Sequence, residues 1–298
     1  IRRPPRSTLD RSSAASDVYK RQGYMGYGIA KNILKKGNNL FVIANKKRAP
    51  IDKIVSDGAI EVKSYNELCE KNLDALFLCV TNTPIALSIA EKVSTLLKDN
   101  TLIIDVTTHN QNGSIQMEQI FSKQKINYIE CPVMGGPVQA EEGVCGGIVG
   151  ASEENFKKSE VYLKTFCKDY FHFGEVGKGA KSKLLNNFLS LGTATNVIEF
   201  IKSAKKLDID LEKLFAVAKL GSGNSTALNR IFDNVLKDDY TGFKFSTSNT
   251  LKDLTYIHEM LKDLGNAEKL ADVKKSIYKK AVEDGNGDLF ISELIQKD

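Results

Sequence analysis

A short glycine-containing segment near the start of the chain has the residue types of a phosphate-binding turn. Gly23-Tyr24-Met25-Gly26 stands at the start of a stretch of helical period. Its two glycines fit the second and third positions of a G-x-G-x-x-G turn, in which Arg21 occupies the first. Such a turn lets the backbone approach a pyrophosphate at a helix N-terminus, where an anion is favoured. A plain loop before a helix explains two glycines equally well.

A basic run follows the next apolar segment. Residues 40–44 are apolar, and Asn45-Lys46-Lys47-Arg48 comes directly after them. A dinucleotide site places an acidic residue here for a ribose diol, or a basic residue for a 2′-phosphate. Three cations and no acid favour NADP over NAD, with Asn45, Lys46 and Arg48 as ligands. The alternative is a solvated basic turn.

Alternating apolar runs and helical periods predict the elements that would position these residues. Helices are expected over residues 25–36 and 85–97, and strands over residues 40–44, 73–80, 101–106, 126–129 and 144–149. This alternation predicts an α/β fold with a Rossmann-type parallel sheet. After about residue 174 only helical periods remain, and the longest covers residues 178–207. We expect a Rossmann-type domain over residues 23–174 and an all-α domain over 175–298, joined by a long helix.

Six motifs occur in order along the chain. They are Gly23–Gly26 with Ala30 and Asn32, Val80-Thr81-Asn82-Thr83-Pro84, Asp105-Val106-Thr107-Thr108, Cys131-Pro132-Val133-Met134-Gly135-Gly136 with Gly143, the segment from Gly177 to Asn187, and Lys252-Asp253-Leu254. Together they resemble the motifs of the β-hydroxyacid dehydrogenase family, which includes 3-hydroxyisobutyrate dehydrogenase and semialdehyde reductases. The resemblance implies hydride transfer between NAD(P) and a small carboxylated semialdehyde or 3-hydroxy acid.

The resemblance also assigns roles to residues. The cofactor-binding positions that it implies are Gly23, Tyr24, Met25, Gly26, Thr83, Pro84, Thr108 and Lys252. It makes Lys183 the general acid/base and Asn187, four residues on, its neighbour on one helix face. A partly desolvated lysine holds its proton less tightly and can protonate an alkoxide or accept that proton in reverse. Asn187 can donate and accept hydrogen bonds, so it can orient the substrate or the lysine.

The expected substrate loop departs from the family pattern at one position. Met134 stands where the substrate-binding serine usually is, and a thioether cannot donate a hydrogen bond. Recognition of a carboxylate would then depend on the backbone N–H groups of Gly135 and Gly136 and on other side chains. The polar segment 221–225 could supply such donors, although a helix N-cap loop explains it as well.

Other functions remain open at this stage. A non-catalytic NADP-binding or chromatin-reader module on the same fold is one alternative, and an imine or phosphogluconate-type reductase is another. The three histidines are far apart in the chain and suggest neither a metal site nor a catalytic triad. We expect His109 to lie in a loop and face solvent.

Charge and cysteine usage limit the partners and the compartment. The net charge is +5, but residues 1–22 carry six basic and two acidic residues, so they account for four of the five units. The remainder is nearly neutral, and we expect no nucleic acid or membrane partner. Five scattered cysteines indicate free thiols in a reducing compartment, the cytoplasm. The resemblance implies a homodimer or homotetramer.

Residues 1–22 differ in composition from the rest of the chain. They hold five of the seven arginines and two of the six prolines. We expect a non-native or disordered segment, with a transit peptide as the alternative. No apolar run precedes Gly23, so the first strand of the sheet is expected to be missing.

Overall fold

The computed structural model describes residues 12–16, 23–44 and 48–297. The chain divides into two compact units, residues 1–183 and 184–298. The division falls within one long helix, α8 (Lys178–Lys206).

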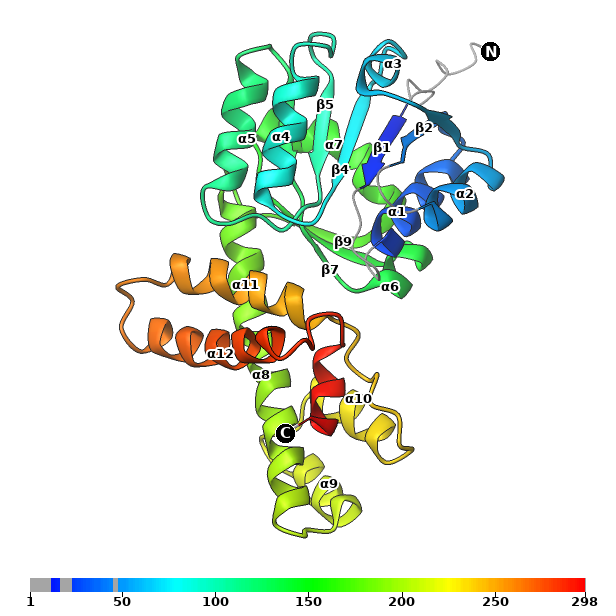
Figure 1. Cartoon of the computed structure of the whole chain (residues 1–298). Helices are drawn as coiled ribbons and strands as arrows, with labels where there is room; N and C mark the ends of the chain where they lie inside the picture. Colours follow the sequence, from blue (N-terminus) through cyan, green and yellow to red (C-terminus); the bar gives the residue numbers. More distant parts are fainter. Residues whose placement is uncertain (1–11, 17–22, 45–47, 298) are drawn as a thin grey trace, which may run out of the picture. The chain divides into compact units, whose positions relative to one another are not determined.

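The first unit is built around a six-stranded parallel sheet (Figure 1). The strand order is β3-β2-β1-β4-β5-β6, and the strands are β1 (Ser12–Ser16), β2 (Leu40–Ile43), β3 (Ile60–Val62), β4 (Ala75–Cys79), β5 (Leu102–Asp105) and β6 (Asn127–Glu130). The helices are α1 (Gly23–Lys35), α2 (Ala49–Ser56), α3 (Tyr65–Cys69), α4 (Thr83–Val93), α5 (Gly113–Ser122), α6 (Pro137–Glu142) and α7 (Glu153–Phe166).

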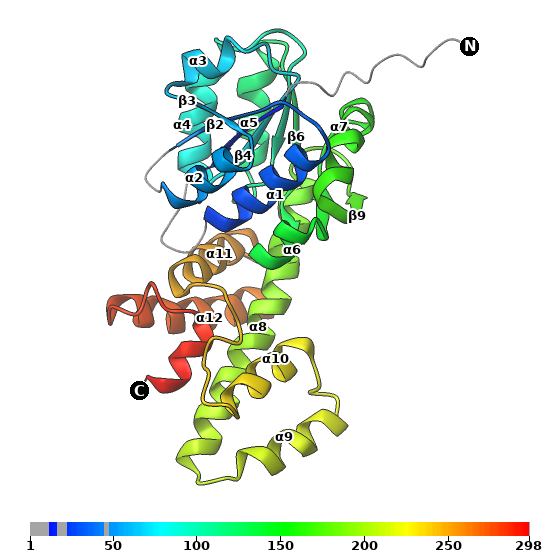
Figure 2. The same cartoon turned by 90° about the vertical axis from the view of Figure 1, so that its right-hand side faces the viewer.

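Alternate residues of the central strands enter two separate cores. In β4, Ala75 and Phe77 pack on the side of α1 and α7, whereas Leu76 and Leu78 pack on the side of α4 and α5. Side chains of successive strand residues point to opposite faces, so a strand covered on both faces must be apolar throughout. Helices therefore cover both faces of the sheet, as Figures 1 and 2 show. The predicted doubly covered parallel sheet is confirmed.

The structure differs from the expectation that the first strand is missing. Ser12–Ser16 form β1 in the middle of the sheet, where Ser13 pairs with Phe41 of β2 and with Leu76 of β4. A parallel strand is held by backbone N–H and C=O groups, which serine and alanine carry like any other residue. Strand β1 therefore forms without an apolar run directly before Gly23.

A second, three-stranded sheet follows the first. Its strands are β7 (Val133–Met134), β8 (Cys145–Val149) and β9 (Cys167–His172), in the order β7-β8-β9. The expected strand near residues 144–149 is present, but it pairs antiparallel with β7 and parallel with β9 instead of extending the main sheet. The antiparallel bridge between Glu130 and Gly150 connects the end of β6 to the end of β8.

The second unit is entirely helical, as predicted. Its elements are the C-terminal part of α8, α9 (Leu211–Leu220), α10 (Thr226–Val235), α11 (Thr247–Met260), α12 (Asn266–Glu283) and the 3-10 helix η1 (Ile291–Gln296). Asp210, Ser225 and Ser246 cap α9, α10 and α11 by accepting backbone N–H groups. The helices enclose one apolar core around Phe232 and Tyr278. Among the described residues, no helix is long and apolar enough to cross a membrane.

Candidate active site

The carboxyl edge of the main sheet has the properties of a dinucleotide site. The strand order reverses between β1 and β4, and ligands of open α/β sheets bind outside such a switch point. Helix α1 follows β1 and α4 follows β4, and neither has an acidic residue in its first turn. The positive ends of their helix dipoles therefore favour an anion there. These residues fit the pyrophosphate of a nicotinamide dinucleotide.

The predicted cofactor residues on α1 lie at the first turn of that helix. Gly23 and Tyr24 begin it, although the placement of their side chains lies outside what the structure describes. Met25 is half-buried against the core, and Gly26 is buried. The two predicted glycines thus lie in the first turn of the helix, the position of the second and third glycines of a dinucleotide-binding motif.

The motif residue Asn32 and its neighbour Gly28 on α1 have a structural role. Asn32 Nδ2 donates to the backbone oxygens of Gly28 and Ala140, both at 2.8 Å. A Cβ atom on Gly28 would lie 2.5 Å from the backbone nitrogen of Glu141, so only glycine lets α1 and α6 approach this closely. Gly28 and Asn32 thus join α1, which we call the cofactor helix, to α6, the helix that follows the substrate loop.

The predicted 2′-phosphate site is only partly described. Asn45 and Lys46 lie outside the described residues. The Arg48 guanidinium donates to Glu61 Oε1 at 2.5 Å and to Asp52 Oδ1 at 2.6 Å, and both carboxylates raise the pKa of Arg48. Arg48 is exposed and keeps its charge, but a phosphate would compete with these two carboxylates for it.

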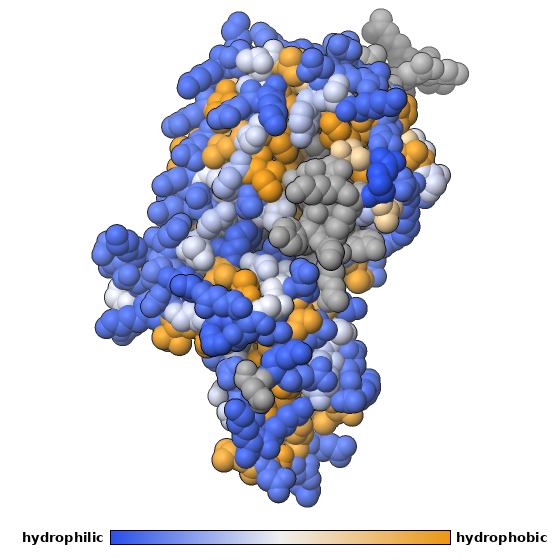
Figure 3. All heavy atoms as spheres, in the orientation of Figure 1, coloured by the Kyte–Doolittle hydropathy of each residue, from blue (hydrophilic) through white to orange (hydrophobic). Residues whose placement is uncertain are grey.

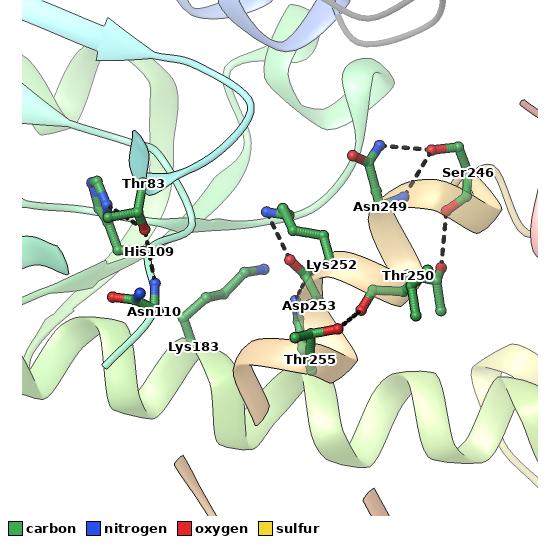
Figure 4. A network of polar contacts seen from close by, with 12 residues as sticks. Thr83, His109, Asn110, Lys183, Ser246, Asn249, Thr250, Lys252, Asp253 and Thr255 are labelled. Carbon is green, nitrogen blue, oxygen red and sulfur yellow. Dashed lines mark hydrogen bonds and ion pairs between the residues drawn. The ribbon is translucent and has the colours of Figure 1, made fainter. Parts of the chain in front are cut away.

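A buried polar cluster joins the ends of β4 and β5 (Figure 4). His109 Nε2 lies 2.7 Å from Asp105 Oδ2, and His109 Nδ1 lies 3.2 Å from Thr83 Oγ1. The backbone N–H of Asn110 donates to Thr83 Oγ1 at 3.1 Å. The hydroxyl of Tyr128 donates to Asp105 Oδ2 at 3.2 Å, and burial raises the pKa of Tyr128 well above its usual value. The cluster holds the predicted cofactor residue Thr83 at the start of α4.

The prediction that His109 faces solvent is wrong. Its side chain is buried, because it follows Asp105 by four residues and the chain turns back over the end of β5. The other predicted cofactor residues of this edge lie close by in the chain. Pro84 is in the first turn of α4, and Thr108, next to His109, is half-buried.

Lys183 lies against the predicted substrate loop. Its side chain is 8% exposed, and Nζ donates to the backbone oxygen of Val133 at 2.8 Å and to Met134 Sδ at 3.3 Å. The structure thus brings the predicted acid/base residue next to the methionine that replaces the usual serine. Nearby, burial raises the pKa of Cys145 to about 12, so this residue remains a thiol at neutral pH. All five cysteines are free.

The glycines of the substrate loop differ from expectation in one respect. Gly135 has a φ of +111°, which favours glycine. The backbone N–H of Gly136 donates to Gln139 Oε1 at 2.8 Å, because the first turn of α6 folds back on the loop. This N–H is therefore engaged by Gln139 in this arrangement, and its binding of a substrate carboxylate remains a prediction.

In the helical unit, Asn187 and the Lys-Asp-Leu motif belong to one network. Asn187 Nδ2 donates to Asp253 Oδ2 at 2.8 Å, and Lys252 Nζ lies 2.8 Å from Asp253 Oδ1, the ion pair shown in Figure 4. Asn187 and Asp253 are both buried. Asn187 is one turn after Lys183 on α8, so the two share a helix face. The roles of Asn187 and Lys252 toward substrate and cofactor remain predictions.

Sequence reasoning missed four residues that the structure ties to the site. Gln139 and Asp253 each engage a predicted site residue, His109 joins the cofactor edge, and buried Glu130 contacts the start of α8. His109 and Gln139 carried a local signal, because each contacts a residue four or three positions away in the chain. Asp253, which belongs to the Lys-Asp-Leu motif, and Glu130 contact residues 66 and 47 positions away. Among the described residues, no group of three or more His, Cys, Asp or Glu side chains is placed to hold a metal ion.

Family models together match nearly the whole chain. Residues 22–174 match the family model of the NAD binding domain of 6-phosphogluconate dehydrogenase. Residues 177–297 match the family model described as NAD-binding of NADP-dependent 3-hydroxyisobutyrate dehydrogenase. Fold and site therefore define a nicotinamide dinucleotide-dependent dehydrogenase. The chain belongs to the β-hydroxyacid dehydrogenase family and is an NAD(P)-dependent hydroxyacid dehydrogenase, as the motifs predicted.

Individual relatives support this assignment at low identity. A probable mitochondrial 3-hydroxyisobutyrate dehydrogenase of Dictyostelium discoideum is 26% identical, over 94% of this chain and 89% of the relative. The 2-(hydroxymethyl)glutarate dehydrogenase of Eubacterium barkeri is 26% identical, over 74% of each. The structure of Mycobacterium tuberculosis 3-hydroxyisobutyrate dehydrogenase with L-serine has a TM-score of 0.84 at 20% identity and covers 97% of this chain and 99% of its own. This last likeness concerns the fold.

The buried cluster predicts a stability effect. Changing His109 to Leu removes a hydrogen-bond partner from the fully buried Asp105 carboxylate, and we expect a loss of about 1–3 kcal/mol in the free energy of unfolding. Urea titration followed by circular dichroism measures this loss. His258→Leu is the control, because that half-buried ring lies next to partly exposed carboxylates. Equal losses in the two variants would contradict the role of the cluster.

Proposed function

We propose that the chain transfers hydride between NADP(H) and a small carboxylated semialdehyde or 3-hydroxy acid, with Lys183 as general acid/base. The observation that carries this proposal is the placement of Lys183 Nζ, buried and in contact with Val133 and Met134 of the substrate loop. A lysine in that position would contact a substrate that binds at the loop. The family membership and the dinucleotide-binding edge of the sheet support the same reaction.

The protein and the cofactor divide the work. The bound nicotinamide supplies a hydride to a carbonyl carbon, or accepts one from an alcohol carbon. Lys183 Nζ gives a proton to the oxygen of the reduced carbonyl and accepts it in the reverse direction. The Val133 oxygen and the Met134 sulfur accept hydrogen bonds from Nζ and keep it at the loop before substrate arrives. With its Nδ2 engaged by Asp253, Asn187 offers its amide oxygen as an acceptor.

Met134 narrows the substrates we propose. Its thioether offers no donor to a carboxylate or hydroxyl, and Gln139 already engages the N–H of Gly136. Charge recognition in this part of the site then depends mainly on Lys183. We propose a substrate with one carboxylate and an apolar substituent facing Met134, such as methylmalonate semialdehyde, over one with an additional hydroxyl at that position.

Replacing Lys183 tests the proposed reaction. Lys183→Ala is expected to lower kcat by about 10²–10⁴-fold, because the proton donor is lost. Lys181→Ala, an exposed residue on the same helix, is the matched control and is expected to keep wild-type turnover. Oxidation of NADPH is followed with glyoxylate, succinate semialdehyde, tartronate semialdehyde and methylmalonate semialdehyde. A Lys183→Ala enzyme with more than about a tenth of wild-type turnover would refute the acid/base role.

The same screen separates the alternative functions. A non-catalytic NADP-binding or chromatin-reader module would bind NADPH without turning over any of the aldehydes. An imine or phosphogluconate-type reductase would prefer a different substrate class over all four. The contact of Lys183 with the substrate loop favours the hydroxyacid dehydrogenase.

Cofactor preference forms a separate proposal, supported by the basic run that includes Lys46 and Arg48. We expect NADPH to bind more tightly than NADH. Arg48→Ala is expected to weaken NADPH binding about tenfold and to leave NADH binding unchanged, because only NADPH carries the 2′-phosphate. Fluorescence titration gives both dissociation constants, and Lys125→Ala, an exposed lysine, is the control. Equal losses for both cofactors would argue against the proposed phosphate contact.

We also propose a homodimer or homotetramer in the cytoplasm. Leu270, Val273 and Ile277 form an exposed apolar stripe on α12, and Figure 3 shows apolar side chains (orange) at the surface of the helical unit. Covering this stripe with a second copy removes it from water. Light scattering after size exclusion is expected to give a multiple of the 32.9 kDa chain mass, and a monomer would contradict the proposal. Free cysteines support the reducing compartment.

A further inference from the structure

Glu130, the last residue of β6, is a buried carboxylate for which the proposed reaction has no direct use. Its side chain is fully buried. Oε1 accepts the backbone N–H of Gly177 at 2.6 Å and that of Gly179 at 2.8 Å. Both N–H groups belong to the start of α8, where a helix leaves its first donors without intrahelical partners. Glu130 therefore caps this helix from a strand 47 residues earlier in the chain.

Two glycines make room for this carboxylate. A Cβ atom on Gly150 would collide with Glu130 Oε1. A Cβ atom on Gly179 would lie 3.0 Å from the same oxygen and 2.8 Å from the backbone nitrogen of Gly150. The Glu130 side chain thus lies between the start of α8 and the ends of β6 and β8. No residue larger than glycine fits at positions 150 and 179 without displacing it.

Charge favours the same arrangement. The first turn of α8 contains no acidic residue, so Glu130 supplies the negative charge that stabilises a helix N-terminus. Burial raises the pKa of the Glu130 carboxyl, while backbone N–H groups at the start of α8 act in the opposite direction. Oε1 is thus held by two donors, whereas the buried Oε2 has no hydrogen-bond partner among the described residues.

The segment that begins with Glu130 contacts α8 twice. Glu130 holds the first turn of the helix, and three residues later the backbone oxygen of Val133 accepts a hydrogen bond from Lys183 Nζ at 2.8 Å. Lys183 follows Gly179 by four residues, one helical turn. The Glu130 contact with the helix start and the Lys183 contact with Val133 together fix the position of Nζ along the loop.

We propose that Glu130 is a positioning residue, which places Lys183 at the substrate loop by holding the start of α8. This inference rests on the proposed function of Lys183 as acid/base. It assigns Glu130 no contact with substrate or cofactor. Glu130 acts on Lys183 Nζ through the helix that carries both contacts. The loss of Glu130 is therefore expected to lower kcat only while Lys183 is present.

The first experiment is a double-mutant cycle. Glu130→Ala is expected to lower kcat about 10- to 100-fold, because a small misplacement of a catalytic group has that cost. Glu130→Gln is expected to recover most of the loss, since its amide oxygen can still accept N–H groups. The variant Glu130→Ala/Lys183→Ala is expected to be no slower than Lys183→Ala alone. A further fall in the double variant would overturn the proposal, because a general structural role lowers both backgrounds equally.

A matched control separates positioning from the loss of any helix cap. Ser152 caps α7, a helix without site residues, by accepting the N–H of Asn155 at 3.3 Å. Ser152→Ala is expected to lose stability by helix-cap removal but to keep its kcat. An equal fall of kcat in Ser152→Ala and Glu130→Ala would overturn the proposal. If Glu130→Ala does not fold, Gly179→Ala takes its place in the cycle, because its Cβ displaces the helix start from Glu130.

The second experiment needs no activity. Acetic anhydride labels lysine amines in the protein without cofactor, and peptide mass spectrometry compares Lys183 with exposed Lys125. We expect Lys183 to be labelled several-fold faster in Glu130→Ala than in wild type, because Nζ leaves the Val133 oxygen. Unchanged labelling would refute the positioning role even where Lys183→Ala abolishes turnover. Faster labelling together with an active Lys183→Ala enzyme would instead refute the acid/base role and leave the positioning contact standing.

Discussion

The arrangement of the first unit depends on one buried carboxylate that cannot be left without donors. An ionised group in the protein interior is costly unless hydrogen bonds replace its water. Glu130 Oε1 obtains two of them from the start of α8, and the Glu130 backbone pairs with Gly150 at the end of β8. The main sheet, the small sheet and the long helix are therefore joined at one point. The helix that carries Lys183 begins there, so the position of the proposed acid/base residue depends on how this carboxyl group is hydrogen-bonded.

The site combines a polar cofactor edge with a largely unreactive substrate loop. At the edge, Asp105, His109 and Thr83 satisfy one another in a buried network, which orders the start of α4. At the loop, a thioether faces the lysine, and the nearby thiol of Cys145 stays protonated because burial raises its pKa to about 12. Neither sulfur competes with Lys183 for the proton that the proposed reaction moves.

The parts of the structure that follow from local pattern could be predicted, and those that depend on distant partners could not. The buried strands β4 and β5 carry apolar residues on both faces, so composition alone indicates them. Strand β1 has no such run, because backbone pairing with β2 and β4 holds its serines and alanines in the sheet. The motifs indicated Lys183 and Asn187, but the contacts of Glu130 and Asp253 reach across 47 and 66 residues. A sequence without an alignment shows no trace of such pairs.

The close approach of α1 and α6 limits how this enzyme can be rebuilt. Gly28 permits the contact, and Asn32 closes it with hydrogen bonds to the carbonyl groups of α6. The cofactor helix α1 and the helix α6 after the substrate loop therefore have to be exchanged together. A chimera that imports α1 from another dehydrogenase, to change its nucleotide preference, must retain Gly28 and Asn32 or exchange α6 as well. Cofactor engineering in this scaffold is thus constrained by the packing of α1 against α6.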